Sequence, residues 1–119
     1  MEVNSRKKNS ILIYDMGGEF SRSDEIAATI HQRVKDQFEI GRKYFIFNFE
    51  KLSFIDSFGI GELVACYISI SKIGGKLKII RIPAKILMLF RIFMLDKIFE
   101  IFDDEETAIK SFIEQEQKV

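Results

Sequence analysis

Apolar segments with the character of β-strands alternate along this chain with segments that have the period of an α-helix. The strand-like segments lie at residues 11–16, 43–49, 76–82 and 99–102, and each is followed by a stretch in which apolar residues recur three or four positions apart. This alternation favours parallel strands, because a parallel connection needs a crossover that a helix supplies. We therefore expect an α/β fold with a mixed, mostly parallel β-sheet of four to five strands and about four α-helices.

Turn and capping residues indicate where these elements end. We expect a first helix from a capping box at 21–24 to about residue 41, a second over 57–73, a third over 83–95 and a fourth after a capping box at 103–106. Gly17 and Gly18 should turn the chain after the first strand, because glycine readily adopts a positive φ. Residues 52–55 should carry the chain from the sheet edge to the second helix.

Length and composition indicate one domain over residues 1–119, with a polar N-terminal arm at 1–10 and a C-terminal tail at 114–119 that frays. The 18 basic and 18 acidic side chains cancel, so the chain lacks the positive field that phosphate binding exploits, and we expect no nucleic acid partner. The most apolar window, 86–95, is too short to span a bilayer, which predicts no direct membrane insertion. A single cysteine and no signal-like start predict a cytoplasmic protein.

Catalytic and metal sites have little support in the sequence. The chain has one histidine, His31, so a site with two histidine ligands is impossible, and Cys66 has no second cysteine beside it. A triad of Ser57 and His31 with an aspartate would lack the GxSxG elbow, and the glycines near Ser57 match neither a dinucleotide fingerprint nor a P-loop. We expect no cofactor, no metal and no enzyme activity.

The junction SFIDSFGIGEL, residues 53–63, joins a strand to the second helix. Asp56 or Ser57 is placed to cap that helix, but Gly59 and Gly61 in its first turn each weaken it by up to about 1 kcal/mol relative to alanine. Glycine there lets another backbone or a phosphate approach the free N–H groups closely. We interpret the junction as a contact surface around a serine that could carry a phosphate at the positive end of the helix dipole.

The same run resembles the signature of the STAS domain, the fold of bacterial anti-sigma factor antagonists, in which a strand leads into [FM]-[IM]-D-S-[ST/A]-G-[LI]-G-x-[LF]. Further likenesses are GGEF at 17–20, GGKLKII at 74–80 and LDKIFEIFDDEETAI at 95–109. Together they cover residues 11–113, and the resemblance implies a single STAS domain.

The resemblance also implies a function, namely a phosphorylation-controlled binding module that switches partners. Its unphosphorylated form would bind an anti-sigma factor that is itself a serine kinase and so release a sigma factor. Phosphorylation of Ser57 would end that binding, and a serine phosphatase would reset it. The partner-binding residues it implies are Asp56, Ser57, Phe58, Gly59, Ile60, Gly61, Glu62 and Ser21.

Four residues depart from the family pattern. Phe58 follows the acceptor serine where a small residue is usual, and we interpret it as a partner anchor, with inward packing as the alternative. Glu62 would compete with a phosphate for the helix dipole. Ser21 stands where an aspartate is common, and Met94 replaces a glycine that commonly ends the third helix, which would then end by another route or run longer.

Two questions stay open at this level. Residues 83–95 are apolar around nearly the whole helix, so this helix is either deep core or a face for a partner or a homodimer that carries Met88, Phe90 or Phe93. The alternative functions are a cytoplasmic STAS subunit of a lipid-exporting ABC transport system and a scaffold of a stress-signalling complex, in neither of which Ser57 needs to be phosphorylated.

Overall fold

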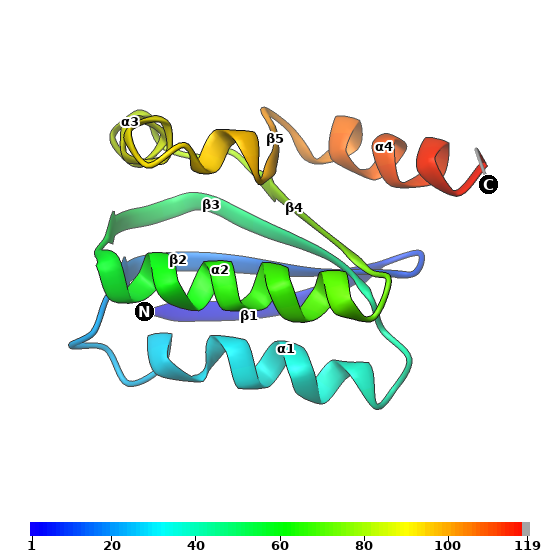
Figure 1. Cartoon of the computed structure of the whole chain (residues 1–119), viewed down its shortest axis with the longest axis horizontal. Helices are drawn as coiled ribbons and strands as arrows, with labels where there is room; N and C mark the ends of the chain where they lie inside the picture. The colour runs from blue at the N-terminus through cyan, green and yellow to red at the C-terminus, as the bar shows by residue number, and fades with distance from the viewer. Residues whose placement is uncertain (118–119) are drawn as a thin grey trace.

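The computed structural model describes residues 1–117, with side chains through residue 114, and shows a five-stranded sheet with four α-helices (Figure 1). The elements are β1 (Glu2–Lys8), β2 (Ile11–Phe20), the 3-10 turn η1 (Ala27–Thr29), α1 (Ile30–Phe38), β3 (Tyr44–Ile55), α2 (Ser57–Lys72), β4 (Lys76–Ile80), α3 (Ala84–Ile92), the 3-10 turn η2 (Leu95–Lys97), β5 (Glu100–Phe102) and α4 (Glu105–Gln117).

The strands follow one another in the order β1-β2-β3-β4-β5. β1 pairs with β2 in the antiparallel sense, and every other neighbouring pair is parallel. The expected mixed, mostly parallel sheet is therefore confirmed. Helices connect the parallel strands, as a crossover between parallel neighbours requires.

The expected polar N-terminal arm is wrong, because residues 2–8 form the edge strand β1. Its seven residues pair one for one with β2, from Glu2 opposite Gly17 to Lys8 opposite Ile11. The strand has no buried side chain and only two half-buried ones, Val3 and Arg6. Its polar sequence gave no alternating pattern to recognise, and charged residues on an edge strand prevent pairing with other chains.

Other boundaries also differ from those expected. Gly17 and Gly18 do not end β2 but lie within it, where the register with β3 shifts on either side of the pair. Residues 52–55 belong to β3 rather than to a connection. The capping residue of α4 is Asp104, whose carboxylate accepts a hydrogen bond from the backbone N–H of Thr107 at 2.8 Å. Of the expected frayed tail, α4 takes in residues up to Gln117, and residues 118–119 lie outside the described residues.

Both faces of the central strands are buried. β3 has five consecutive buried residues at 45–49, as the apolar run predicts. The larger core cluster joins one sheet face to α1, α2 and α3, and the smaller joins the other face to Ala108 and Phe112 of α4. Figure 1 shows α1 and α2 along the sheet and α3 and α4 on the side of β4 and β5. The helices cover both faces of the sheet, but α4 leaves the part of its face nearest the start of β1 open.

α3 is shorter than expected and has two different sides. It ends at Ile92, and Met94 takes up a left-handed conformation at φ 59°, which glycine commonly adopts at the end of a helix. The helix therefore ends by the same turn without the glycine. Phe90 is buried against Phe49, so its interpretation as part of a surface is wrong, whereas Met88 and Phe93 are exposed.

Candidate functional site

The first turn of α2 is held to the end of β2 by one carboxylate. Asp56 is the N-cap, and its Oδ1 accepts a hydrogen bond from the backbone N–H of Gly59 at 2.9 Å. Its Oδ2 accepts from the backbone N–H of Arg22 at 3.0 Å. Of the two candidates for the cap, Asp56 therefore has this role, and it also joins two segments that are far apart in the sequence.

Backbone hydrogen bonds keep Asp56 ionised. The N–H groups of Arg22 and Gly59 lower the pKa of its carboxyl group below the usual value, because they stabilise the charged form. The negative charge lies at the N-terminus of α2, where the helix dipole favours it. A fixed anion is thus present beside Ser57 in the unmodified protein.

Ser57 is the first residue of α2 and its side chain is exposed. Its position at the N-terminal end places the hydroxyl next to helix N–H groups that have no partner within the helix. A phosphate at this position would be in solvent and at the positive end of the helix dipole. The geometry is therefore suited to a modification that changes the surface without disturbing the core.

The two glycines of the junction, Gly59 and Gly61, have different surroundings. A Cβ on Gly59 would lie 2.1 Å from the carbonyl oxygen of Phe20, whereas a Cβ on Gly61 would meet no atom within 4 Å. Gly59 is buried and its lack of a side chain allows the backbone of β2 to approach α2. The prediction that Gly59 provides clearance for a partner is therefore wrong, and the prediction for Gly61 stays open.

The two apolar residues of the first turn pack inward. Phe58 and Ile60 are half-buried, and both pack against the larger core cluster. The inward alternative therefore describes the packing of Phe58, and its role as a partner anchor stays a prediction. What remains exposed beside Ser57 is Phe54 at the end of β3, which sequence reasoning did not single out.

Glu62 and Ser21 also have roles inside the protein. Glu62 Oε2 accepts a hydrogen bond from the backbone N–H of His31 at 3.0 Å, and His31 Nε2 lies 2.8 Å from Ser69 Oγ. Glu62 therefore stabilises the start of α1, and its competition with a phosphate for the dipole of α2 stays a prediction. Ser21 is buried, with its hydroxyl 3.1 Å from that of Ser23, so it supports the turn around Arg22 and does not face a partner.

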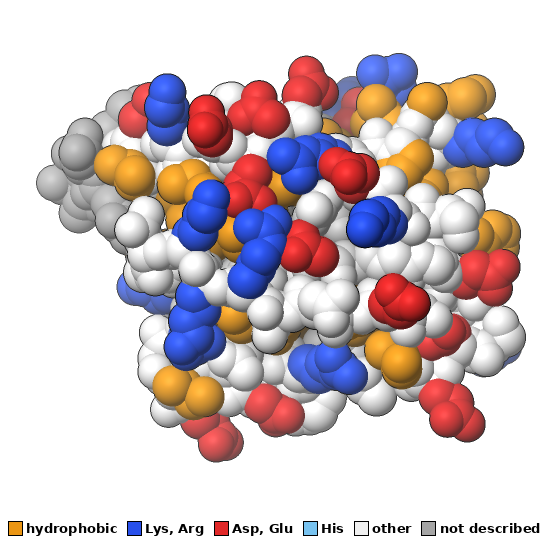
Figure 2. Space-filling model, turned by 180° about the vertical axis from the view of Figure 1, so that it is seen from behind, with side chains coloured by type: hydrophobic (Ala, Val, Ile, Leu, Met, Phe, Trp, Pro, Cys, Tyr) orange, Lys and Arg blue, Asp and Glu red, His pale blue; other side chains and the backbone are white. Residues whose placement is uncertain are grey.

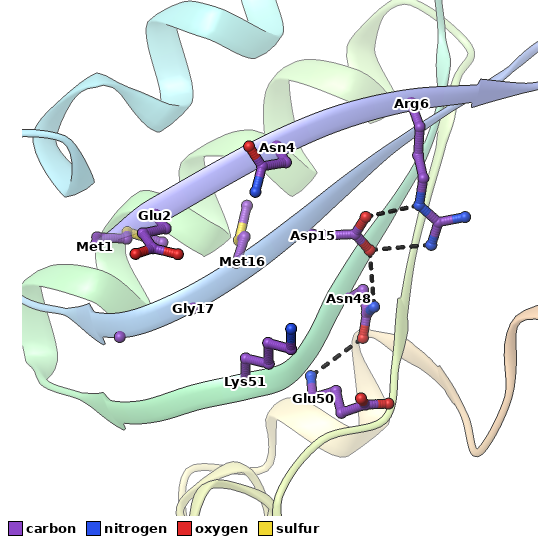
Figure 3. Close-up of a pocket in the computed structure, with 11 residues that line it drawn as sticks. Met1, Glu2, Asn4, Arg6, Asp15, Met16, Gly17, Asn48, Glu50 and Lys51 are labelled. Carbon is purple, nitrogen blue, oxygen red and sulfur yellow. Dashed lines mark hydrogen bonds and ion pairs between the residues drawn. The ribbon is translucent and has the colours of Figure 1, made fainter.

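A hollow of about 680 Å³ lies on the part of the sheet that α4 leaves uncovered (Figure 3). At one end of it Arg6, Asp15 and Asn48 point toward one another: Arg6 Nε donates to Asp15 Oδ2 at 2.6 Å, and Asn48 Nδ2 donates to Asp15 Oδ1 at 2.8 Å. Figure 2, which shows the side opposite α2, has acidic and basic side chains intermingled. Because acidic and basic side chains both line the hollow, it favours no ligand of one sign.

The pairing of Arg6 predicts how stability depends on acid. Hydrogen bonds from Arg6 lower the pKa values of Asp15 and of Glu105, to which Arg6 also donates. Stabilisation from lowered pKa values is complete above the unfolded values of about 4, and it is lost as the pH falls through the folded values. We expect Arg6→Gln to flatten the fall in unfolding free energy below about pH 4.

Urea unfolding between neutral pH and the acid limit of the folded state measures this dependence for the wild type and for Arg6→Gln. Arg33→Gln, which removes the same charge from α1, is the matched control and should keep the wild-type pH dependence. Equal pH dependence in all three proteins would contradict the assignment of the acid effect to Arg6.

Metal and thiol chemistry find no support among the described residues. No three His, Cys, Asp or Glu side chains of residues 1–117 lie together as a metal site would need. Cys66 is buried, and burial raises the pKa of its thiol to about 12, which leaves it protonated and unreactive at neutral pH. In the described part of the chain, no helix has both the length and the apolar character needed to span a bilayer.

The family model of the STAS domain matches residues 2–108. SpoIIAA from Bacillus, an anti-sigma factor antagonist, has been solved in two forms: the unphosphorylated form is 18% identical with a TM-score of 0.72 over 95% of this chain and 98% of that chain, and the phosphorylated form is 21% identical with a TM-score of 0.72 over 93% and 99%. A putative anti-sigma factor antagonist from Thermotoga maritima is 20% identical, with a TM-score of 0.73 over 92% of each chain.

A sulfate transporter family protein from Wolinella succinogenes also matches, at 18% identity and a TM-score of 0.67 over 86% of this chain and 84% of that chain. At these identities the likeness shows a common fold. The same fold is therefore found in proteins described as regulators and in one described as belonging to a transporter family.

Proposed function

The chain belongs to the STAS domain family, and on that premise we propose that it is an anti-sigma factor antagonist switched by phosphorylation of Ser57. The observation that carries the proposal is the exposed hydroxyl of Ser57 at the start of α2, beside the ionised carboxylate of Asp56. The existence of SpoIIAA structures in unphosphorylated and phosphorylated forms supports it by analogy of fold.

In the unphosphorylated state the surface around Ser57 offers a partner the exposed ring of Phe54, the hydroxyl of Ser57 and the open side of Gly61. The partner is an anti-sigma factor with serine kinase activity, which releases its sigma factor when this surface binds. The protein acts in the cytoplasm by binding and not by catalysis, and its effect is on transcription.

Phosphorylation ends this binding by electrostatics. A phosphate adds about −1.5 to −2 charges at neutral pH. Together with Asp56 it makes a concentrated negative surface, which a partner fitted to a neutral hydroxyl cannot cover without desolvating those charges. The fold is unaffected, because the phosphate is in solvent and the helix dipole favours it. A serine phosphatase restores the binding form.

A pull-down with variants at residue 57 tests the switch. We expect wild type and Ser57→Ala to capture a protein kinase homologue, and Ser57→Asp to lose it. Incubation of the wild type with the captured protein and Mg-ATP should place a phosphate on Ser57, as read by phosphopeptide mass spectrometry. Ser71→Asp, which adds the same charge at the other end of α2, is the control and should retain the partner.

Gly61→Ala gives an independent test of the surface, because its Cβ would meet nothing within the protein. It should leave the fold intact and weaken capture if a partner lies close to this turn. Capture that survives in Ser57→Asp, with no phosphate on Ser57 in the wild type, would contradict the switch. It would then favour a transport subunit or a signalling scaffold in which Ser57 is not modified.

A further inference from the structure

The outward side of α3 is an apolar stripe between two cations. Ile86 and Phe90 are buried and face the core. Met88 and Ile92 are four residues apart, so they lie on one face of the helix, and their side chains are 60% and 67% exposed. At 3.6 residues per turn, Lys85 and Arg91 fall on either side of this pair. The helix therefore has one apolar face that packs on the core and a second apolar face, between two basic residues, that is exposed to solvent.

The turn after α3 adds more exposed apolar surface. Phe93 and Met94 are 58% and 60% exposed, and Ile98 follows after η2 with about half of its side chain exposed. Met94 has φ 59°, a left-handed conformation that is unfavourable for a residue with a side chain. A large apolar side chain is thus kept in solvent at a position where glycine would be less strained. The apolar corner, as we call it, consists of Met88, Ile92, Phe93, Met94 and Ile98.

The segment that carries the apolar corner has mostly positive charges. Between residues 84 and 98 the basic residues are Lys85, Arg91 and Lys97, and the one acidic residue is Asp96. The whole chain has no net charge, so this is a local excess. In Figure 2 hydrophobic side chains gather with basic ones at the upper right, where α3 lies.

This distribution argues against a second copy of the chain as the occupant. In a two-fold symmetric dimer the same patch forms both sides of the contact, so the basic residues around the corner would be brought close to one another. Met88, Ile92, Phe93 and Met94 are exposed and line neither the hollow beside β1 nor the one beside Pro83. The positive charge of residues 84–98 is complementary to a negative surface.

We propose that the apolar corner docks on the surface of an anionic lipid bilayer. Phe93, Met94 and Ile92 enter the headgroup region, while Lys85, Arg91 and Lys97 lie against lipid phosphates. Exposed apolar side chains flanked by lysine and arginine are the combination that holds a peripheral helix in the membrane interface. The contact is peripheral and reversible, it involves no membrane-spanning segment, and it is independent of phosphorylation of Ser57.

A tryptophan at the corner reports the contact directly, because the chain contains no other tryptophan. Phe93→Trp should show a blue-shifted emission with vesicles of phosphatidylcholine and phosphatidylglycerol, and brominated lipids in the same vesicles should quench it. Vesicles of phosphatidylcholine alone should cause neither change, and added salt should reverse the binding. An unchanged spectrum with the anionic vesicles would overturn the proposal.

Matched variants distinguish binding through the apolar corner from nonspecific electrostatic attraction of the whole protein to the vesicles. In vesicle sedimentation, Lys85→Glu with Arg91→Glu should weaken binding by about 30-fold. Lys7→Glu with Lys72→Glu makes the same change in net charge elsewhere on the surface and should bind as the wild type does. Ile92→Ser should weaken binding, and Ile40→Ser should not, because both isoleucines are 67% exposed but Ile40 follows α1, at the opposite edge of the molecule from α3 in Figure 1.

Two outcomes of these measurements would overturn the proposal. The first is equal loss of binding in the corner variants and their controls, which would mean nonspecific attraction. The second is a dimer in light scattering that Ile92→Ser dissociates while vesicles bind no variant, which would mean that a second copy covers the corner. Circular dichroism of each variant verifies that the fold is retained.

Discussion

Gly59→Ala is expected to lower the free energy of unfolding by about 3 kcal/mol. The new Cβ would lie 2.1 Å from the carbonyl oxygen of Phe20 and 2.8 Å from Cγ1 of Ile55. One of these contacts is with backbone, so a change of rotamer cannot relieve it, and β2 and α2 must move apart. That movement would also disturb the hydrogen bond from the N–H of Asp56 to the same oxygen, at 3.3 Å.

Gly61→Ala is the matched control, since it makes the same substitution two residues later on the same helix. Its Cβ meets no atom within 4 Å, so the usual preference for alanine should stabilise the helix by up to about 1 kcal/mol. Urea unfolding of both variants, with comparison of their m-values, gives the difference. Similar free energies for the two variants would show that β2 and α2 do not approach as closely as the structure has them.

Asp56→Ala is expected to destabilise the protein by about 2–4 kcal/mol, from loss of a helix cap and of a charged hydrogen bond. The cap bond is to the N–H of Gly59, and the second bond is to the N–H of Arg22 in the segment after β2. Without the carboxylate, both N–H groups must hydrogen-bond to water instead. The start of α2 and the segment after β2 then lose the hydrogen bonds that connect them. Urea unfolding at neutral pH measures the loss.

Asp104→Ala separates the two contributions of Asp56. Asp104 caps α4 through the N–H of Thr107, with its second oxygen 3.1 Å from the hydroxyl of the same residue, so it joins no distant segment. We expect its replacement to cost about 1 kcal/mol. If Asp56→Ala costs no more than Asp104→Ala, the bond to Arg22 contributes nothing to stability.

The expected loss of stability in the Asp56 and Gly59 variants limits their use in testing the proposed switch. Asp56 and Gly59 lie in the recognised DSFGIG run, but both act within the protein. A loss of partner binding in either variant would therefore report damage to the fold as well as to the surface. Ser57 and Gly61 are the positions of this run at which binding can be tested without changing a contact of the core.

Much of the architecture could be predicted from local patterns. The apolar runs at 43–49 and 76–82 became β3 and β4, and the second helix begins and ends within a residue of its expected limits. The strand signals are strong because a strand that is buried on both faces needs a continuous run of apolar residues. The helix limits can be predicted because a capping residue or a glycine starts or ends the helix next to it in the sequence. The same reasoning could not find β1, whose pairing depends on β2 and not on its own apolar residues.

The α/β class, the family resemblance and the serine at the start of α2 could all be predicted from local sequence, because each depends on neighbouring residues in the chain. Which residues around that serine face solvent depends on how the strands and helices pack. Ser21, Glu62 and Gly59 were expected at a partner surface, yet Ser21 is buried, Glu62 accepts a hydrogen bond from the start of α1, and Gly59 allows the end of β2 to approach α2. Side-chain identity does not specify such contacts, since they exist only once the strands and helices have packed.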